Sequence, residues 1–214
     1  MSDASQEVVF YTNPMSRGRI VHWMLEETGC AYRTQTLAYE SMHSERYLDI
    51  NPMGKVPAIT HRGVVVTETA AICAYLADAF PEAGLAPAPG EPLRGTYLRW
   101  LFFAAGPVEA AVTAHTLGQD PPAEKSAFVG YGSYALCMDQ LERIAASASP
   151  WLLGERFSAA DVYVGSQILY GMRFASVPTR PAFTAYGERL MQRPAWQRAS
   201  AADDALVPPG SVPG

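Results

Sequence analysis

The hydrophobic pattern of the chain changes near residue 81, and this change constrains the fold more than any other feature of the sequence. Before it, strand-like runs alternate with helix-like runs in the order β-α-β-α-β-β-α. After the segment "EAGLAPAPGEP", which has no apolar periodicity, the pattern is helical almost throughout. We therefore predict an α/β domain over residues 1–81, a linker over 82–92, an all-helical domain over 93–205 and a loose tail over 206–214.

Local signals support this division. The runs "EVVFYT", "AYRTQTL", "VPAIT" and "VVVTE" have strand character, and "HRG" between the last two predicts a tight antiparallel hairpin. In "GERFSAADVYVG", Ser158 and Asp161 have the spacing of a capping box at a helix start. The helices expected beyond the linker lie near Leu93–His115, Glu124–Ser147, Ser158–Phe174, Pro181–Arg193 and Pro194–Ala202.

Composition excludes several classes of function. The formal net charge is −5 without a dense Lys/Arg run, which argues against nucleic acid or an anionic membrane as the main partner. Cys30, Cys73 and Cys137 lie far apart, which argues against a disulfide framework and against a metal site. The N-terminus lacks the pattern of a signal peptide, and no apolar run approaches the roughly 18 residues that span a bilayer. We expect a soluble, cytoplasmic protein.

Two short motifs predict a binding site for a small peptide. Pro57 lies inside the apolar run "VPAI", and a cis Val56–Pro57 bond would turn the Val56 amide and carbonyl outward, where they can pair with an extended peptide. Glu68 and Thr69 precede an alanine-rich helix, whose N-terminal amides favour a bound carboxylate. The Glu68 carboxylate can hold an ammonium group at the same time. Together these groups suit a peptide that has both an amino-acid head and an extended amide.

The motifs "NPMGKVPAI" and "ETAAICAYL", preceded by "YTNPMSRGR" and followed by "FSAADV", resemble those of the glutathione transferases over nearly the whole chain. The resemblance implies the glutathione transferase fold, a thioredoxin-like α/β domain followed by an all-α domain, with glutathione as co-substrate. By this resemblance Val56 binds the cysteinyl backbone, Pro57 is cis, and Glu68 and Thr69 hold the γ-glutamyl head. Lys55 either meets the glycine carboxylate or is a solvated loop charge.

The chemistry of such a protein requires the thiolate form of glutathione. Ser16 lies where the first strand gives way to the first helix, and it matches the serine of the bacterial, serine-type, theta-like branch. Its hydroxyl and the helix N-terminus can stabilise an anionic sulfur, although Ser16 can also simply cap the helix. Tyr11, at the end of the first strand, is the second candidate. Arg17 and Arg19 add positive potential here, or are solvated or paired elsewhere.

The second substrate is expected between the domains, against the first long helix of the second half. Its candidate contacts are Phe102, Phe103 and His115. The resulting prediction is a homodimeric enzyme that conjugates glutathione to an apolar electrophile, without a metal. Two alternatives stay open: a glutathione-dependent peroxidase, disulfide reductase or isomerase, and a non-catalytic interaction module of the same fold.

Overall fold

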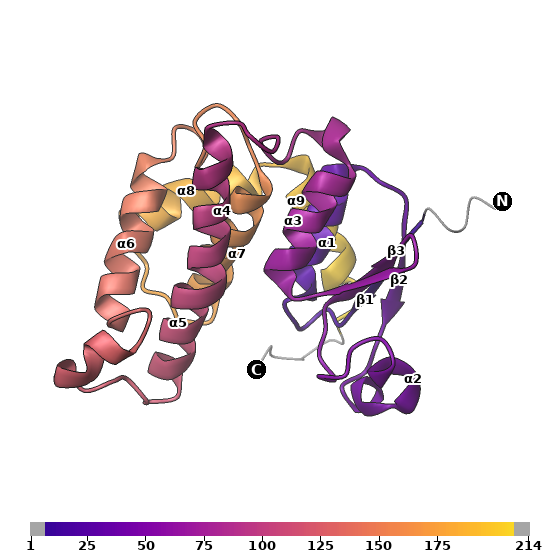
Figure 1. Ribbon diagram of the computed structural model, residues 1–214, viewed down its shortest axis with the longest axis horizontal. Helices are drawn as coiled ribbons and strands as arrows, with labels where there is room; N and C mark the ends of the chain where they lie inside the picture. The colour runs from indigo at the N-terminus through magenta and orange to yellow at the C-terminus, as the bar shows by residue number, and fades with distance from the viewer. Residues whose placement is uncertain (1–6, 208–214) are drawn as a thin grey trace. The chain divides into compact units, whose positions relative to one another are not determined.

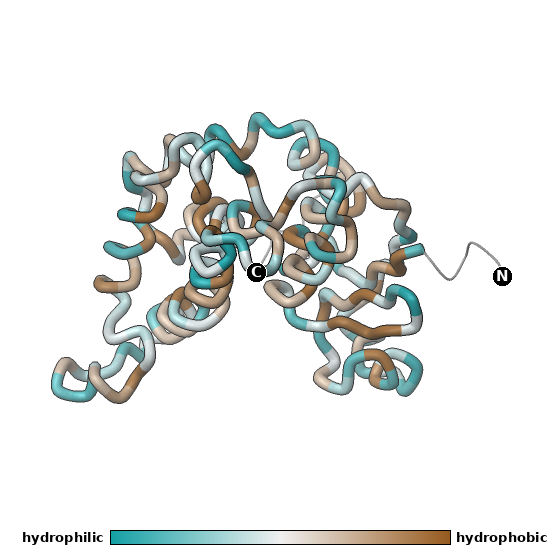
Figure 2. The backbone as a smooth tube through the Cα atoms, turned by 45° about the horizontal axis from the view of Figure 1, so that its top comes forward, coloured by the Kyte–Doolittle hydropathy of each residue, from teal (hydrophilic) through white to brown (hydrophobic). Residues whose placement is uncertain are grey.

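The computed structural model describes residues 7–207. Contacts within the chain divide these residues into two units: a sheet unit of residues 7–83 and 193–207, and a helical unit of residues 84–192. In both units apolar stretches alternate with hydrophilic ones, and the hydrophilic stretches lie mostly in turns and connections (Figure 2).

The sheet unit has the element order that the sequence predicts. Its elements are β1 (Val8–Thr12), α1 (Gly18–Thr28), β2 (Tyr32–Thr36), a 3-10 helix (Glu40–His43), α2 (Glu45–Leu48), β3 (Ala58–His61), β4 (Val64–Thr67), α3 (Thr69–Ala79), a second 3-10 helix (Pro81–Ala83) and α9 (Pro194–Asp204). Up to α3 this is the predicted β-α-β-α-β-β-α series of a thioredoxin-like domain, which is therefore confirmed.

The strands form a sheet in the order β2-β1-β3-β4. β1 pairs in parallel with β2 and antiparallel with β3, and β3 pairs antiparallel with β4. Arg62 and Gly63 connect β3 to β4 with positive φ angles of 53° and 77°, as a type I′ hairpin turn requires. The tight turn expected from "HRG" is therefore present.

Helices α1 and α3 lie side by side on the sheet, and α9 lies next to α1 (Figure 1). Alternate residues of β1 are buried, and Val8 and Phe10 have no exposed surface. Gly18 begins α1 so close to the end of β1 that an added Cβ would lie 1.9 Å from Thr12 Oγ1. Only glycine fits at this position, because both the strand end and the helix start are buried.

The position of α9 differs from the predicted division of the chain. The helical pattern of the sequence predicts one domain over residues 93–205, whereas contacts group α9 with the sheet unit. The reason lies in polar side-chain pairs that join α9 and its N-cap residue Arg193 to α1, which a hydrophobic pattern does not reveal. These pairs are Arg193 with Glu27, Arg198 with Glu26, Asp203 with His22, and Asp204 with Arg19. Whether residues 93–205 fold as a domain on their own stays a prediction.

The helical unit contains α4 (Leu93–Phe103), a π-helical segment (Ala104–Val108), α5 (Glu109–Thr116), a 3-10 helix (Ala123–Phe128), α6 (Tyr134–Ser147), α7 (Ala159–Arg173) and α8 (Pro181–Met191). The helix expected near Leu93–His115 is present but widens around Pro107, which lacks an N–H group and crowds the carbonyl of Phe103. The helix expected near Glu124–Ser147 begins only at Tyr134, and Ser133 caps it. Across residues 7–207, no helix is long and apolar enough to cross a membrane.

The start of α7 confirms the predicted capping box. Ser158 and Asp161 are both fully buried, and each caps the backbone of the other. The Asp161 carboxylate also accepts hydrogen bonds from the Leu152 N–H at 2.8 Å and from the Tyr186 hydroxyl at 2.8 Å. This carboxylate therefore ties the start of α7 to α8 and to the segment before α7.

Candidate functional site

The sheet register brings the motif segments together at one edge. Tyr11 of β1 pairs with Ala58 of β3, and Ala58 pairs with Thr67 of β4. Because β3 runs antiparallel to both neighbours, β1 and β4 end where β3 begins. The turn after β1, the Val56–Pro57 segment and Glu68 therefore lie next to one another along this edge.

Ser16 lies in the turn after β1, and its hydroxyl has two partners within the chain. It donates to the Asn13 carbonyl at 2.7 Å, and its oxygen accepts the Gly18 N–H at 3.0 Å. The Asn13 carbonyl also accepts the Ser16 N–H at 3.1 Å. The Ser16 oxygen thus satisfies one free N–H group at the start of α1, where Arg17 is the N-cap residue, and the Ser16 side chain is partly exposed.

Asn13 holds this turn in place, and sequence reasoning missed it. Its side-chain amide donates to the Leu37 carbonyl at 2.9 Å, and its side-chain oxygen accepts the Met15 N–H at 2.9 Å. The dipeptide Asn13–Pro14, a known turn former, is the signal that could have found it. The turn is thereby tied to the segment that follows β2.

Tyr11 and the two arginines occupy distinct environments. The Tyr11 ring packs 5.8 Å from the ring of Tyr47, as expected for a strand residue that contributes packing. Arg17 is exposed at the helix start. Arg19 is buried, donates to the Pro14 carbonyl, and forms an ion pair with Asp204 at 2.7 Å. The Arg19 guanidinium therefore contacts both α9, through Asp204, and the turn after β1, through Pro14.

The Val56–Pro57 peptide bond is cis, as the resemblance implies. Within residues 7–207, the Val56 backbone makes no hydrogen bond to the rest of the chain. The carbonyl before it, that of Lys55, accepts hydrogen bonds from the Tyr47 hydroxyl at 2.6 Å and from the Asn51 side-chain amide at 2.7 Å. The Lys55 side chain is exposed.

Glu68 stands at the start of α3 in an unusual backbone conformation. Its φ is 65° and its ψ is 115°, a region that residues other than glycine rarely adopt. Such strained residues cluster at ligand-binding sites, where the surrounding structure holds them. The Glu68 side chain is exposed, whereas Thr69, the first residue of α3, is buried. The carboxylate of Glu68 is therefore open to a ligand at the edge where the other segments meet.

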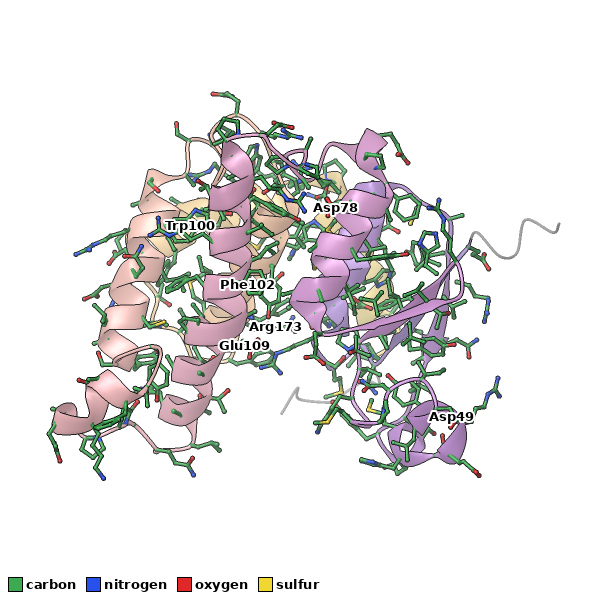
Figure 3. All side chains as sticks on the ribbon, in the orientation of Figure 1. Asp49, Asp78, Trp100, Phe102, Glu109 and Arg173 are labelled. Atoms are coloured by element: carbon green, nitrogen blue, oxygen red, sulfur yellow. The ribbon has the colours of Figure 1, made fainter. Side chains whose placement is uncertain are left out.

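The predicted contacts for a second substrate lie on α4 and α5. Phe102 lies near the end of α4 (Figure 3) and is 73% exposed. The Phe103 ring packs 6.1 Å from that of Trp100. His115 pairs with Asp120 at 2.6 Å and stacks on Tyr134. Phe102 and His115 lie 13 positions apart along nearly continuous helix, about 20 Å at a rise of about 1.5 Å per residue. The structure therefore does not bring His115 together with the two phenylalanines.

The described part of the chain contains no group of three or more His, Cys, Asp or Glu side chains arranged to hold a metal ion. Cys30, Cys73 and Cys137 are all free. Burial raises the pKa of the Cys73 thiol well above its usual range and that of Cys137 to about 11. None of the three thiols is thus poised as a reactive thiolate.

Parts of the chain match known proteins in sequence. Residues 15–79 match the family described as "Glutathione S-transferase, N-terminal domain". Over 57 residues the chain is 47% identical to Protein LigF of a Sphingobium species, in an alignment that covers 27% of this chain and 22% of LigF. This local match therefore spans far less than two thirds of LigF.

Solved structures extend the similarity to almost the full length. A glutathione transferase from Methylococcus capsulatus superposes with a TM-score of 0.76 at 29% identity, covering 92% of this chain and 99% of that one. A sphingomonad glutathione S-transferase complexed with glutathione gives a TM-score of 0.74 at 28% identity, covering 92% and 98%. The chain has the two-domain fold of these enzymes, and its residues 15–79 match their N-terminal domain. Two of the similar solved structures hold bound glutathione.

Proposed function

We propose that the chain is a glutathione transferase that binds glutathione at the sheet edge and directs its thiolate at an apolar electrophile. The observation that carries the proposal is the convergence of three segments, set by the pairing of Tyr11 with Ala58 and of Ala58 with Thr67. One edge thus offers a hydroxyl, an unpaired backbone and an exposed carboxylate beside a helix N-terminus.

Each part of the tripeptide has a matching group in this proposal. The Val56 N–H and C=O pair with the cysteinyl backbone as an added strand would. The γ-glutamyl head binds at the start of α3, where Glu68 accepts the ammonium group, and Thr69 with the first backbone amides of the helix receives the carboxylate. Lys55 is placed to meet the glycine carboxylate, and Arg17 adds positive charge at the start of α1.

Ser16 is the proposed donor to the sulfur. A free thiol with a pKa of about 8.5 is only about 3% ionised at pH 7, and lowering that pKa by about two units takes roughly 2.7 kcal/mol. The Ser16 hydroxyl turns from the Asn13 carbonyl toward the sulfur while its oxygen still accepts the Gly18 N–H. The Asn13 carbonyl still accepts the Ser16 N–H, so the rotation leaves this buried carbonyl with a hydrogen-bond partner.

The reaction then needs no covalent enzyme intermediate. The thiol proton leaves to water, the thiolate attacks the electrophilic atom, and the leaving group departs with the bonding electrons or a strained ring opens. The serine-type, theta-like branch, the cytoplasmic location, the homodimer, and Phe102, Phe103 and His115 as substrate contacts remain parts of this proposal. Tyr11 is the alternative hydroxyl, and peroxidase, disulfide reductase or isomerase chemistry uses the same thiolate.

Titration of the bound thiol by its ultraviolet absorbance tests the proposal. We expect glutathione bound to the wild-type chain to ionise about two pH units below free glutathione. Ser16→Ala should raise that pKa and lower kcat by about one to three orders of magnitude, as for other lost oxyanion donors. Ser133→Ala, which removes the serine cap of α6, is the matched control and should change neither.

Three results would revise the proposal. An ordinary thiol pKa in the wild-type complex rejects the transferase and leaves a glutathione-binding module. If only Tyr11→Phe raises the thiol pKa, Tyr11 is the donor and Ser16 is only a cap. No retention on immobilised glutathione rejects the binding site altogether.

A further inference from the structure

The carbonyl oxygen of Lys55 is held by two side chains, one on α2 and one in the turn directly after it. Tyr47 of α2 donates its hydroxyl at 2.6 Å, and Asn51, in the turn after α2, donates its side-chain amide at 2.7 Å. A carbonyl oxygen has two lone pairs, so these two donors fill its acceptor capacity. Neither contact involves the Lys55 side chain, which is exposed. The two side chains therefore hold a backbone atom.

Both donors are themselves fixed. Tyr47 and Asn51 are each 3% exposed, and the Tyr47 ring packs against that of Tyr11. The Asn51 side-chain oxygen accepts the Met53 N–H at 3.1 Å, and its backbone carbonyl accepts the Gly54 N–H at 2.9 Å. Gly54 has a φ of +60°, and a Cβ there would lie 2.8 Å from the His43 ring. The turn from Asn51 to Lys55 is thus closed on itself and packed against its neighbours.

Holding the Lys55 oxygen also sets the direction of the Val56 N–H. The Lys55–Val56 peptide is trans, since the cis bonds within residues 7–207 are Val56–Pro57 and Ser149–Pro150. In a planar trans peptide the C=O and the following N–H point in opposite directions. Because Tyr47 and Asn51 fix the oxygen on one side, they aim the Val56 N–H to the other. That N–H is the donor that the proposed function pairs with the cysteinyl backbone.

We propose that Tyr47 and Asn51 are positioning residues for glutathione, which aim the Val56 N–H by clamping the Lys55 carbonyl. This inference rests on the proposed function, because it concerns the same site. The clamp of Tyr47 and Asn51 affects how the tripeptide backbone is bound. It does not act through the Ser16 hydroxyl. It should therefore contribute equally to the bound ground state and to the transition state, and change KM without changing kcat.

Tyr47→Phe removes one hydroxyl and leaves the ring and the Asn51 contact in place. Tyr32→Phe is the matched control: its hydroxyl donates to Glu26 at 2.6 Å in the same unit but does not reach the Lys55 carbonyl. By calorimetry we expect Tyr47→Phe to raise the Kd of glutathione about tenfold, because one neutral hydrogen bond no longer aims the donor. Tyr32→Phe should leave that Kd unchanged.

Two further readouts separate positioning from a general loss of structure. The pKa of the bound thiol should be the same in Tyr47→Phe and in the wild type. S-methylglutathione, which has no ionisable thiol, should lose affinity for Tyr47→Phe by the same factor as glutathione. A purely structural role of Tyr47 would instead lower the unfolding temperature of Tyr47→Phe and leave its Kd near that of the wild type.

The outcomes are distinct from those that test the proposed function. If the wild type binds glutathione and Tyr47→Phe binds it equally well, or if Tyr32→Phe weakens binding as much, the positioning role is overturned while the proposed function stands. A shifted thiol pKa in Tyr47→Phe also overturns it, since the clamp would then act on sulfur. If the wild type binds no glutathione, the proposed function fails and this inference fails with it.

Discussion

Ser158 and Ser16 both lie at the start of a helix, α7 and α1 respectively, and their surroundings differ in one decisive respect. At α7 the Ser158 hydroxyl donates to the Asp161 carboxylate at 2.9 Å, and Ser158 is fully buried. At α1 the Ser16 hydroxyl donates to a neutral backbone carbonyl, that of Asn13, and Ser16 is partly exposed. The same residue type thus meets a buried acid in one place and an accessible turn in the other.

This difference decides which hydroxyl can serve a ligand. Turning Ser158 away would remove a donor from a buried carboxylate, which costs more than a neutral hydrogen bond because charged groups are desolvated at a higher cost. Turning Ser16 away leaves the Asn13 carbonyl with the Ser16 N–H as donor. The rotation therefore costs about one hydrogen bond, on the order of 1 kcal/mol. A helix-start serine is available for chemistry where its acceptor is neutral and has a second donor.

The largest effect is expected at the start of α7, when the Asp161 carboxylate is removed. Asp161→Ala should lower the free energy of unfolding by about 4 kcal/mol, since it removes a cap and leaves the Leu152 N–H and the buried Tyr186 hydroxyl without their acceptor. Urea unfolding followed by circular dichroism measures the loss. Ser133→Ala, at the exposed start of α6, is the control and should cost only about 1 kcal/mol. Equal losses in the two variants would contradict the central role of Asp161.

The contrast also shows how much the sequence could predict. Ser158 and Asp161 lie three residues apart, so their pairing can be read from the chain, as can the β-α-β-α-β-β-α order and the turn at Arg62–Gly63. The clamp from Tyr47 to the Lys55 carbonyl ends on a backbone atom, which leaves no trace in residue type. The pairing of His22 with Asp203 joins residues 181 positions apart, and no local pattern predicts which helix α1 meets.

The second effect is a dependence of the free energy of unfolding on pH, caused by Asp161 at the start of α7. Burial raises the pKa of Asp161 to about 6, although hydrogen bonds from Leu152, Tyr186 and Ser158 oppose the shift. The folded chain then binds a proton at Asp161 more readily than the unfolded chain, so this stability is fully present below about pH 4. It is lost as the pH rises to about 6, and the total is about 3 kcal/mol.

Asp161→Asn isolates this contribution, because it removes the titrating group and keeps the side-chain shape. The difference in unfolding free energy between the wild type and Asp161→Asn should shrink as the pH rises from about 4 to about 7. Other acids, such as Glu26, titrate in both proteins and cancel in the difference. A difference that stays flat or grows over this range means that Asp161 is already ionised near pH 4, and that its donors outweigh its burial.

The smallest change in stability is expected at Ser16, at the start of α1. It tests the comparison between Ser16 and Ser158 most sharply. Ser16→Ala should lower the free energy of unfolding by about 1 kcal/mol, the usual cost of losing a partly exposed cap. Ser158→Ala should cost about 2 kcal/mol or more, because it leaves a buried carboxylate with one donor fewer. Urea unfolding of both variants measures the difference. If Ser16→Ala costs as much as Ser158→Ala, the Ser16 hydroxyl is a structural cap as tightly committed as that of α7, and it is not free to turn toward a ligand.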